Sequence, residues 1–447
     1  METQPRFSLR ALHLPKKEVL SGAFFWLGAF YFVYCARPED WVPGMGYLPL
    51  AKITSILALL ALAMSFGRTK RGARDIPREG IYLGVMIGWM FLAALTSPVW
   101  RSGSLLRTLD FSKVWVAWVL TYLLVTTFTR LRQIIFIQAG SVAVVALVSI
   151  IKGHGTARLE GVLNGIYSNS NDLAFAIVLA LPFCLAFLLT AKGGFRKLIW
   201  GGAMLVMCAA LFLTASRAGF IDLVISGSVC LWYFGVKGRR PQLIAAAVLV
   251  LATMLLGVGG LLRARFMAVV GNGVDPTTHS AYGSFEERKF LYYKSLEAIE
   301  NHPVLGVGPH CFANYSGIWK VVHNAYLQIG AEAGIPALVL YVMFLGSAFK
   351  NLRQLRKRQD LDLHTTLFVG ALHSSLIGFA VGALFAPSGY NYFPYFAVAQ
   401  TSVLMAIVRE HDASVAAPEL AKEPGRHPGV YARTQPSSSS KPIPSLY

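Results

Sequence analysis

Charged residues are scarce in this chain, and acidic residues are the scarcest of them. Asp, Glu, Lys and Arg together make up 14% of the 447 residues, whereas hydrophobic residues make up 55%. A soluble globular domain is roughly a quarter charged. No second soluble domain, internal repeat or heptad pattern is evident either. These shortages exclude an ordinary soluble enzyme and indicate a polytopic helical membrane protein.

Cysteines are few and lack the spacing of a metal site. The five of them, Cys35, Cys184, Cys208, Cys230 and Cys311, are scattered along the chain. This excludes a zinc ribbon and a disulfide framework. We therefore predict no bound metal and no cofactor. A pairing of Cys35 with Cys311, both expected on the outer face, is left open.

Long apolar runs recur from Ser21 to Val408, and they predict an all-α fold with about 12 transmembrane helices. Lys and Arg fall in alternate loops, with five each in residues 67–79 and 350–366. By the positive-inside rule, these loops and both termini are cytoplasmic. The rule also explains the net charge of +19, so nucleic acid is not an expected partner.

These spans divide the chain into five predicted parts. Residues 1–18 form a cytoplasmic N-terminus, and residues 19–262 hold transmembrane helices one to nine. A large periplasmic loop covers residues 263–324, and helices ten to twelve cover residues 325–410. Residues 411–447 are rich in Pro, Ser and Ala, which predicts a disordered cytoplasmic tail.

The long polar interval, residues 263–334, is the predicted site of function. Within it, residues 285–299 carry apolar side chains at near-helical spacing, which predicts a short amphipathic helix on the membrane surface. Residues 301–309 contain two glycines without P-loop spacing, so a structural turn is favoured over a phosphate cradle. We expect the loop and the helix ends beneath it to bind a charged, lipid-carried substrate.

Two arginines are candidate anion ligands. Arg217 lies where one apolar run ends and the next begins, with almost no loop between them. Placing an arginine there costs a few kcal/mol unless its side chain is paired or faces water. The alternative is an arginine that snorkels to the interface. A guanidinium suits a diphosphate because it is planar and always charged. Arg288 is either a second ligand or part of a solvated helix face.

His323 precedes the predicted tenth span and is a candidate general base. The positive end of the helix dipole favours a neutral imidazole there, which can accept a proton from a sugar hydroxyl. An ordinary interfacial histidine is the alternative. Glu332 lies about two and a half turns deeper, where a carboxylate needs a partner. An arginine or a histidine is the expected one.

Taken in order, these motifs resemble the O-antigen ligase / O-antigen polymerase superfamily. The segments that carry the resemblance are residues 161–171, 214–219 (Thr-Ala-Ser-Arg-Ala-Gly), 298–308, 323–328 (His-Asn-Ala-Tyr-Leu-Gln) and 332–334, together with Arg288 and Phe312. The resemblance implies a GT-C-like glycosyltransferase in the bacterial inner membrane, with its active site facing the periplasm. Ser170 stands where relatives often have proline between two asparagines.

The resemblance also implies the substrates and the roles of residues. The donor would be a glycan on undecaprenyl diphosphate. Arg217 and Arg288 would bind the diphosphate, and His323 would activate the acceptor hydroxyl. The wider set of expected substrate-binding residues is Arg158, Asn171, Arg265 and Glu332.

The sequence does not identify the acceptor of the glycan. It is lipid A-core in a ligase, another glycan in an O-antigen or exopolysaccharide polymerase, and a protein in an O-oligosaccharyltransferase. A polysaccharide transporter or flippase is the alternative from a different class. The absence of repeated halves, and the clustering of candidate residues on one face, argue against it.

Overall fold

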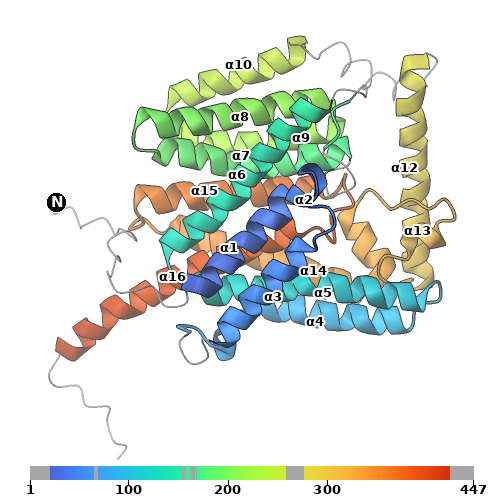
Figure 1. Ribbon diagram of the computed structural model, residues 1–447, viewed down its shortest axis with the longest axis horizontal. Helices are drawn as coiled ribbons and strands as arrows, with labels where there is room; N and C mark the ends of the chain where they lie inside the picture. Colours follow the sequence, from blue (N-terminus) through green and yellow to red (C-terminus); the bar gives the residue numbers. More distant parts are fainter. Residues whose placement is uncertain are drawn as a thin grey trace, which may run out of the picture. The chain divides into compact units, whose positions relative to one another are not determined.

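The computed structural model describes residues 21–64, 69–153, 158–161, 167, 169–257 and 276–422, and these residues are almost entirely helical (Figure 1). No β-strand occurs within those ranges, which confirms the all-α prediction. The helices are, in chain order, α1 (Ser21–Ala36), α2 (Pro38–Trp41), α3 (Leu50–Ala63), η2 (Ala73–Asp75), α4 (Arg78–Leu95), α5 (Arg101–Leu124), α6 (Phe128–Lys152), α7 (Ser170–Thr190), α8 (Gly194–Thr214), α9 (Arg217–Leu231), η3 (Trp232–Val236), α10 (Pro241–Gly257), α12 (Pro276–Asn301), α13 (Phe312–Tyr315), α14 (Ala325–Lys357), α15 (Leu363–Gly382) and α16 (Tyr392–Lys422).

Each of the predicted spans coincides with a helix in the described part of the chain. They are α1, α3 to α10, and α14 to α16. Seven helices there, α9 with η3 counted as one, are long and apolar enough to cross a membrane, while α1, α3 and α10 are shorter apolar helices. The described residues therefore form a polytopic membrane protein.

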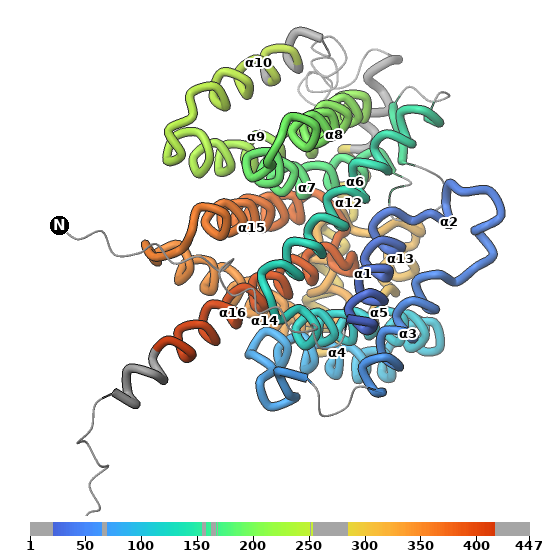
Figure 2. The backbone as a smooth tube through the Cα atoms, turned by 60° about the vertical axis from the view of Figure 1, so that its left-hand side comes forward, coloured from blue at the N-terminus to red at the C-terminus, as the bar shows by residue number. Residues whose placement is uncertain are grey.

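Helix α7 is the most enclosed of the spans. It packs against α8, α15, α6 and α9 (Figures 1 and 2). Nearly all of its side chains from Leu173 to Phe187 are buried. An apolar helix with no lipid-facing stripe is expected in the centre of a helix bundle. Through α7 and α15, the N-terminal end of α9 is held in the same bundle as α14.

Helix α14 is interrupted near its start by a residue with non-helical dihedral angles. Gly334 has φ 81° and ψ 172°, a conformation that favours glycine. Pro336 follows two residues later, inside the same helix. The interruption frees backbone carbonyls of the preceding turn, because the residues after it no longer donate to them.

Helix α12 contains the predicted amphipathic segment and is longer than expected. Leu291 and Ala298 on one face are buried against Phe312, Val322 and Ala331. The aromatic residues of the opposite side are exposed, as in helices that lie at a membrane interface. Figure 1 shows α12 running across the bundle helices rather than along them.

Helix α16 ends at Lys422, so helical structure continues past residue 411, where the disordered tail is predicted to begin. Residues 423–447 and the predicted cytoplasmic N-terminus, residues 1–18, lie outside the described residues.

Candidate functional site

The turn formed by residues 301–309 packs on the interruption of α14. The Val307 N–H donates to the Ala331 carbonyl at 2.9 Å, and the Gly308 N–H donates to the Glu332 carbonyl at 2.9 Å. Gly306 has φ 65°, and a Cβ there would lie 2.4 Å from the backbone carbon of Glu332. The glycines of this motif thus serve close backbone packing, as the turn interpretation predicts.

The Glu332 carboxylate holds the segment that follows this turn. Its side chain is buried and accepts hydrogen bonds from the backbone N–H groups of His310 at 2.9 Å and Phe312 at 3.3 Å. We expected an arginine or histidine side chain as its partner, and backbone donors stand there instead. The Tyr390 phenol lies beside the carboxylate, and burial together with this negative charge raises the pKa of Tyr390.

His323 and Arg288 are brought together at the start of α14. The Asn324 side chain caps the helix by accepting the N–H groups of Tyr326 and Leu327, both at 3.0 Å. Burial, and next the guanidinium of Arg288, lower the pKa of His323 to about 4. The imidazole is therefore neutral near pH 7, which is the form that a general base requires.

A second group of predicted residues meets at the corner between α8 and α9. Arg158 donates through Nε to the Thr214 carbonyl at 2.9 Å and through Nη2 to Asn171 Oδ1 at 3.2 Å. The Ser216 hydroxyl donates to the same Asn171 oxygen at 2.8 Å. Arg217, the first residue of α9, is adjacent to this network and half-buried.

The last turn of α15 connects the two groups. The Ala325 N–H at the start of α14 donates to the Ala383 carbonyl at 2.8 Å. A Cβ on the neighbouring Gly382 would lie 2.8 Å from Asp222 Oδ2, in the second turn of α9. The α8–α9 corner and His323 are thus at the same end of α9, α14 and α15. Arg265 lies outside the described residues.

Sequence reasoning did not identify His310, Tyr390 or Asp222. The His310 and Tyr390 rings stack with centroids 4.0 Å apart, and burial, followed by the charge of Arg107, lowers the pKa of His310 to about 4. Asp222 could have been recognised in the sequence, because it is an acidic residue inside the apolar run that follows Arg217. Nothing in the sequence connects His310 with Tyr390. No cluster of potential metal ligands occurs in the described part of the chain.

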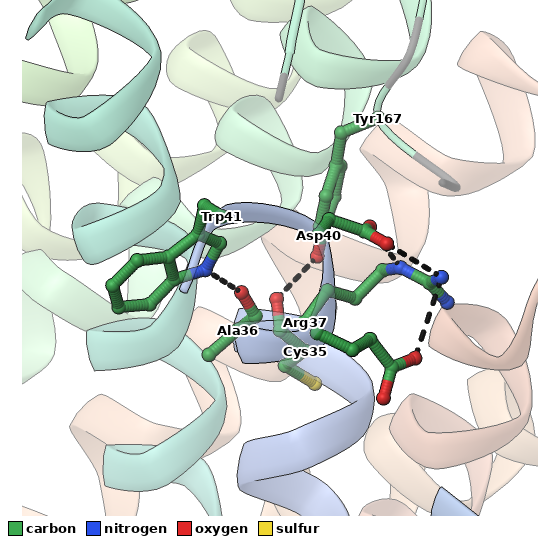
Figure 3. A network of polar contacts seen from close by, with 7 residues as sticks. Cys35, Ala36, Arg37, Asp40, Trp41 and Tyr167 are labelled. Atoms are coloured by element: carbon green, nitrogen blue, oxygen red, sulfur yellow. Dashed lines mark hydrogen bonds and ion pairs between the residues drawn. The ribbon is translucent and has the colours of Figure 1, made fainter. Parts of the chain in front are cut away.

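Tyr167 is attached to the corner between α1 and α2 (Figure 3). The Tyr167 hydroxyl donates to the Cys35 carbonyl at 2.7 Å. Arg37 adopts a left-handed conformation with φ 46°, and its Nη2 donates to Asp40 at 3.1 Å. Both Cys35 and Cys311 are free thiols in this structure, so the open question of their pairing is answered in the negative.

Comparison with known proteins bears on the same region. Residues 202–342 match the family model described as O-antigen ligase, and this match includes Arg217, Arg288, His323 and Glu332. The exopolysaccharide production protein ExoQ of Rhizobium meliloti (strain 1021) is 25% identical over 269 residues, which cover 54% of this chain and 57% of that protein. The chain thus matches little more than half the length of this relative. Both findings support the O-antigen ligase/polymerase superfamily.

Proposed function

We propose that this chain, an enzyme of the O-antigen ligase/polymerase type by its similarity, transfers a glycan from undecaprenyl diphosphate to an acceptor hydroxyl. The observation that carries the proposal is the neutral His323 imidazole beside the Arg288 guanidinium, within the matched region. The pair combines a proton acceptor with a fixed positive charge. We assign the reaction to the periplasmic face of the inner membrane.

The proposed reaction is a displacement at the anomeric carbon of the donor sugar. The acceptor oxygen forms the new glycosidic bond while the bond to the diphosphate oxygen breaks. The electron pair of the broken bond leaves with undecaprenyl diphosphate, and the hydroxyl proton passes to the His323 ring. Arg288 stabilises the negative charge that develops on the leaving diphosphate, because a preorganised cation needs no rearrangement during the step.

Arg217 supplies the second positive charge in this proposal. The Asn171 oxygen accepts hydrogen bonds from both Arg158 and Ser216, so the corner that presents Arg217 is fixed before substrate binds. Groups that are already fixed lose little conformational entropy when the substrate binds, which favours tight binding of the diphosphate. Arg158 and Asn171 then act mainly by positioning Arg217.

The test is transfer activity in membranes that contain R217A, R288A or H323A protein. Each variant is expected to lose about a hundredfold or more of the activity, as for removal of a group that stabilises the transition state. Lys289→Ala, which removes an exposed charge next to Arg288, is the matched control and keeps its activity. Immunoblotting of membranes checks abundance. Full activity in all three variants would contradict the proposal.

A polymerase is the second candidate, favoured by the description of the relative as an exopolysaccharide production protein. Deletion of the gene separates the acceptors. Loss of glycan from lipid A-core indicates a ligase, shortened chains indicate a polymerase, and loss of glycan from protein indicates an O-oligosaccharyltransferase. A flippase is distinguished with purified protein in detergent, where only a transferase forms a new glycosidic bond.

A further inference from the structure

A basic cavity lies at the end of α14 opposite to His323. Its volume is about 590 Å³, and η3, the last turns of α14 and the first half of α15 enclose it. The part of α14 that follows Gly334, residues 335–357, corresponds to about 35 Å of helix, so the cavity at its far end is separated from the candidate transferase site. It is therefore a separate feature of the molecule.

The lining of this cavity is cationic on several sides. Its basic members are Lys237, Arg240, Arg353, Arg356, Lys357 and Arg358. No Asp or Glu is among the described residues that line it. Of the two acids in the adjoining turn, Asp360 pairs with Arg358, which is itself a lining residue, and Asp362 accepts the Thr365 N–H at 3.1 Å. Asp360 thus offsets one of the six positive charges, and the cavity keeps an excess of positive charge.

The floor of the cavity is an organised group of side chains. The Tyr233 hydroxyl lies 3.0 Å from His373 Nδ1, and the Arg356 guanidinium lies 4.9 Å above the Tyr233 ring. Tyr233 belongs to η3, a π-helical turn, and such turns are frequent at functional sites. Hydrogen bonding and cation–π contact therefore connect these three lining residues to one another.

Arg240 provides a second, independent observation. Its Nη1 atom is buried and has no hydrogen-bond partner in the described part of the chain. A buried guanidinium N–H without an acceptor is costly, and an anionic oxygen is the acceptor that suits it best. An anionic oxygen in this cavity would satisfy the Arg240 donor.

We propose that this cavity binds a phosphate-bearing anion. Basic pockets between transmembrane helices are the usual sites for anionic lipid headgroups on the cytoplasmic side. The positive-inside rule explains why cations lie at this end of the helices. The rule does not explain why these cations surround a cavity, or why the buried Arg240 Nη1 has no acceptor among the described residues. Phosphatidylglycerol and free phosphate carry the same recognised group, and the experiment separates them.

The experiment compares two triple variants of the full chain, purified in detergent. R240Q/R353Q/R356Q removes charges from the cavity. R74Q/R78Q/K350Q removes the same number from exposed positions outside it. Each protein is incubated with phosphatidylglycerol, with phosphatidylcholine or with inorganic phosphate alone. Bound lipid is measured by native mass spectrometry, and the thermal shift is measured for all three probes.

The wild type and the exposed-charge variant are expected to bind phosphatidylglycerol at least about tenfold more tightly than the cavity variant does. A thermal shift with inorganic phosphate that the cavity variant loses also supports the proposal, with a free anion as ligand. R240K/R353K/R356K keeps the three charges and should therefore retain the binding, which would show that the cavity variant loses binding with the charge and not through poor folding. Equal binding by the cavity and exposed-charge variants, or no preference over phosphatidylcholine, would overturn the proposal.

Discussion

The Glu332 carboxylate, just before the interruption of α14, accepts a hydrogen bond from the backbone N–H of His310 at 2.9 Å. A second bond from Phe312 at 3.3 Å completes the attachment. Two residues 22 positions apart are thereby fixed to each other, and the His310 ring is placed on Tyr390. An acid that sequence reasoning assigned to substrate binding thus organises the loop around the site.

Replacing Glu332 by alanine should therefore destabilise the protein strongly. Two N–H groups lose their acceptor, at about 1–3 kcal/mol each, so we expect a loss of about 2–6 kcal/mol. E332Q keeps one acceptor oxygen and should lose less. Urea denaturation in detergent measures the difference. E300Q, at an exposed position of α12, is the control and should change the free energy of unfolding by less than about 0.5 kcal/mol.

Two glycines of α14 should respond in opposite directions to substitution by alanine. At Gly334 the φ of 81° is unfavourable for alanine, and a Cβ would lie 2.1 Å from the Val304 carbonyl oxygen. G334A is expected to lower the free energy of unfolding by more than about 2 kcal/mol. At Gly346 nothing lies within 4 Å, so G346A should raise it by about 0.5–1 kcal/mol. Similar effects of both substitutions on the melting temperature would contradict this account.

The spans could be predicted from the sequence because lipid requires long apolar helices, and few other segments have that composition. Helix α12 was predicted from its periodicity, although only in part. The sequence named Arg158 and Asn171 as expected substrate-binding residues, but no spacing rule predicted that their side chains are in contact. Local composition therefore determines the elements but not which side chains meet.

The interruption of α14 shows what the sequence could not reveal. Proline is the usual cause of an irregular helix, but the non-helical residue here is Gly334 and not Pro336. The position is set instead by the turn at residues 301–309, whose N–H groups take the carbonyls that Gly334 releases. The stacking of His310 on Tyr390 is likewise a tertiary contact between residues 80 positions apart. Such contacts depend on packing between elements, which no local pattern encodes.

The stability of the fold should depend on pH through His310 and His323. Both have a pKa lowered to about 4 by burial, from the usual value of 6.5. Between these values the unfolded chain binds protons that the folded protein does not, so the free energy of unfolding falls as the pH drops from 6.5 to 4. Each histidine contributes about 1–2 kcal/mol to this fall, allowing for partial exposure.

Denaturation measured at pH 7 and pH 5 checks this. H310Q and H323Q should each reduce the difference between the two pH values. The control variant is H411Q, in α16, which should leave the difference as it is in the wild type. An unchanged difference in both site variants would assign the acid sensitivity to other groups.

Asp222 should be replaceable by asparagine with a gain in stability. The side chain is buried in α9, and neither carboxylate oxygen has a hydrogen-bond partner in the described part of the chain. A charge buried without a partner is costly, and asparagine has the same size without the charge. D222N is therefore expected to raise the free energy of unfolding by about 1 kcal/mol or more, whereas D110N, at an exposed ion pair with Lys113, should change it little. Urea denaturation in detergent provides the measurement. A destabilised D222N would show that the carboxylate has a partner in the folded protein.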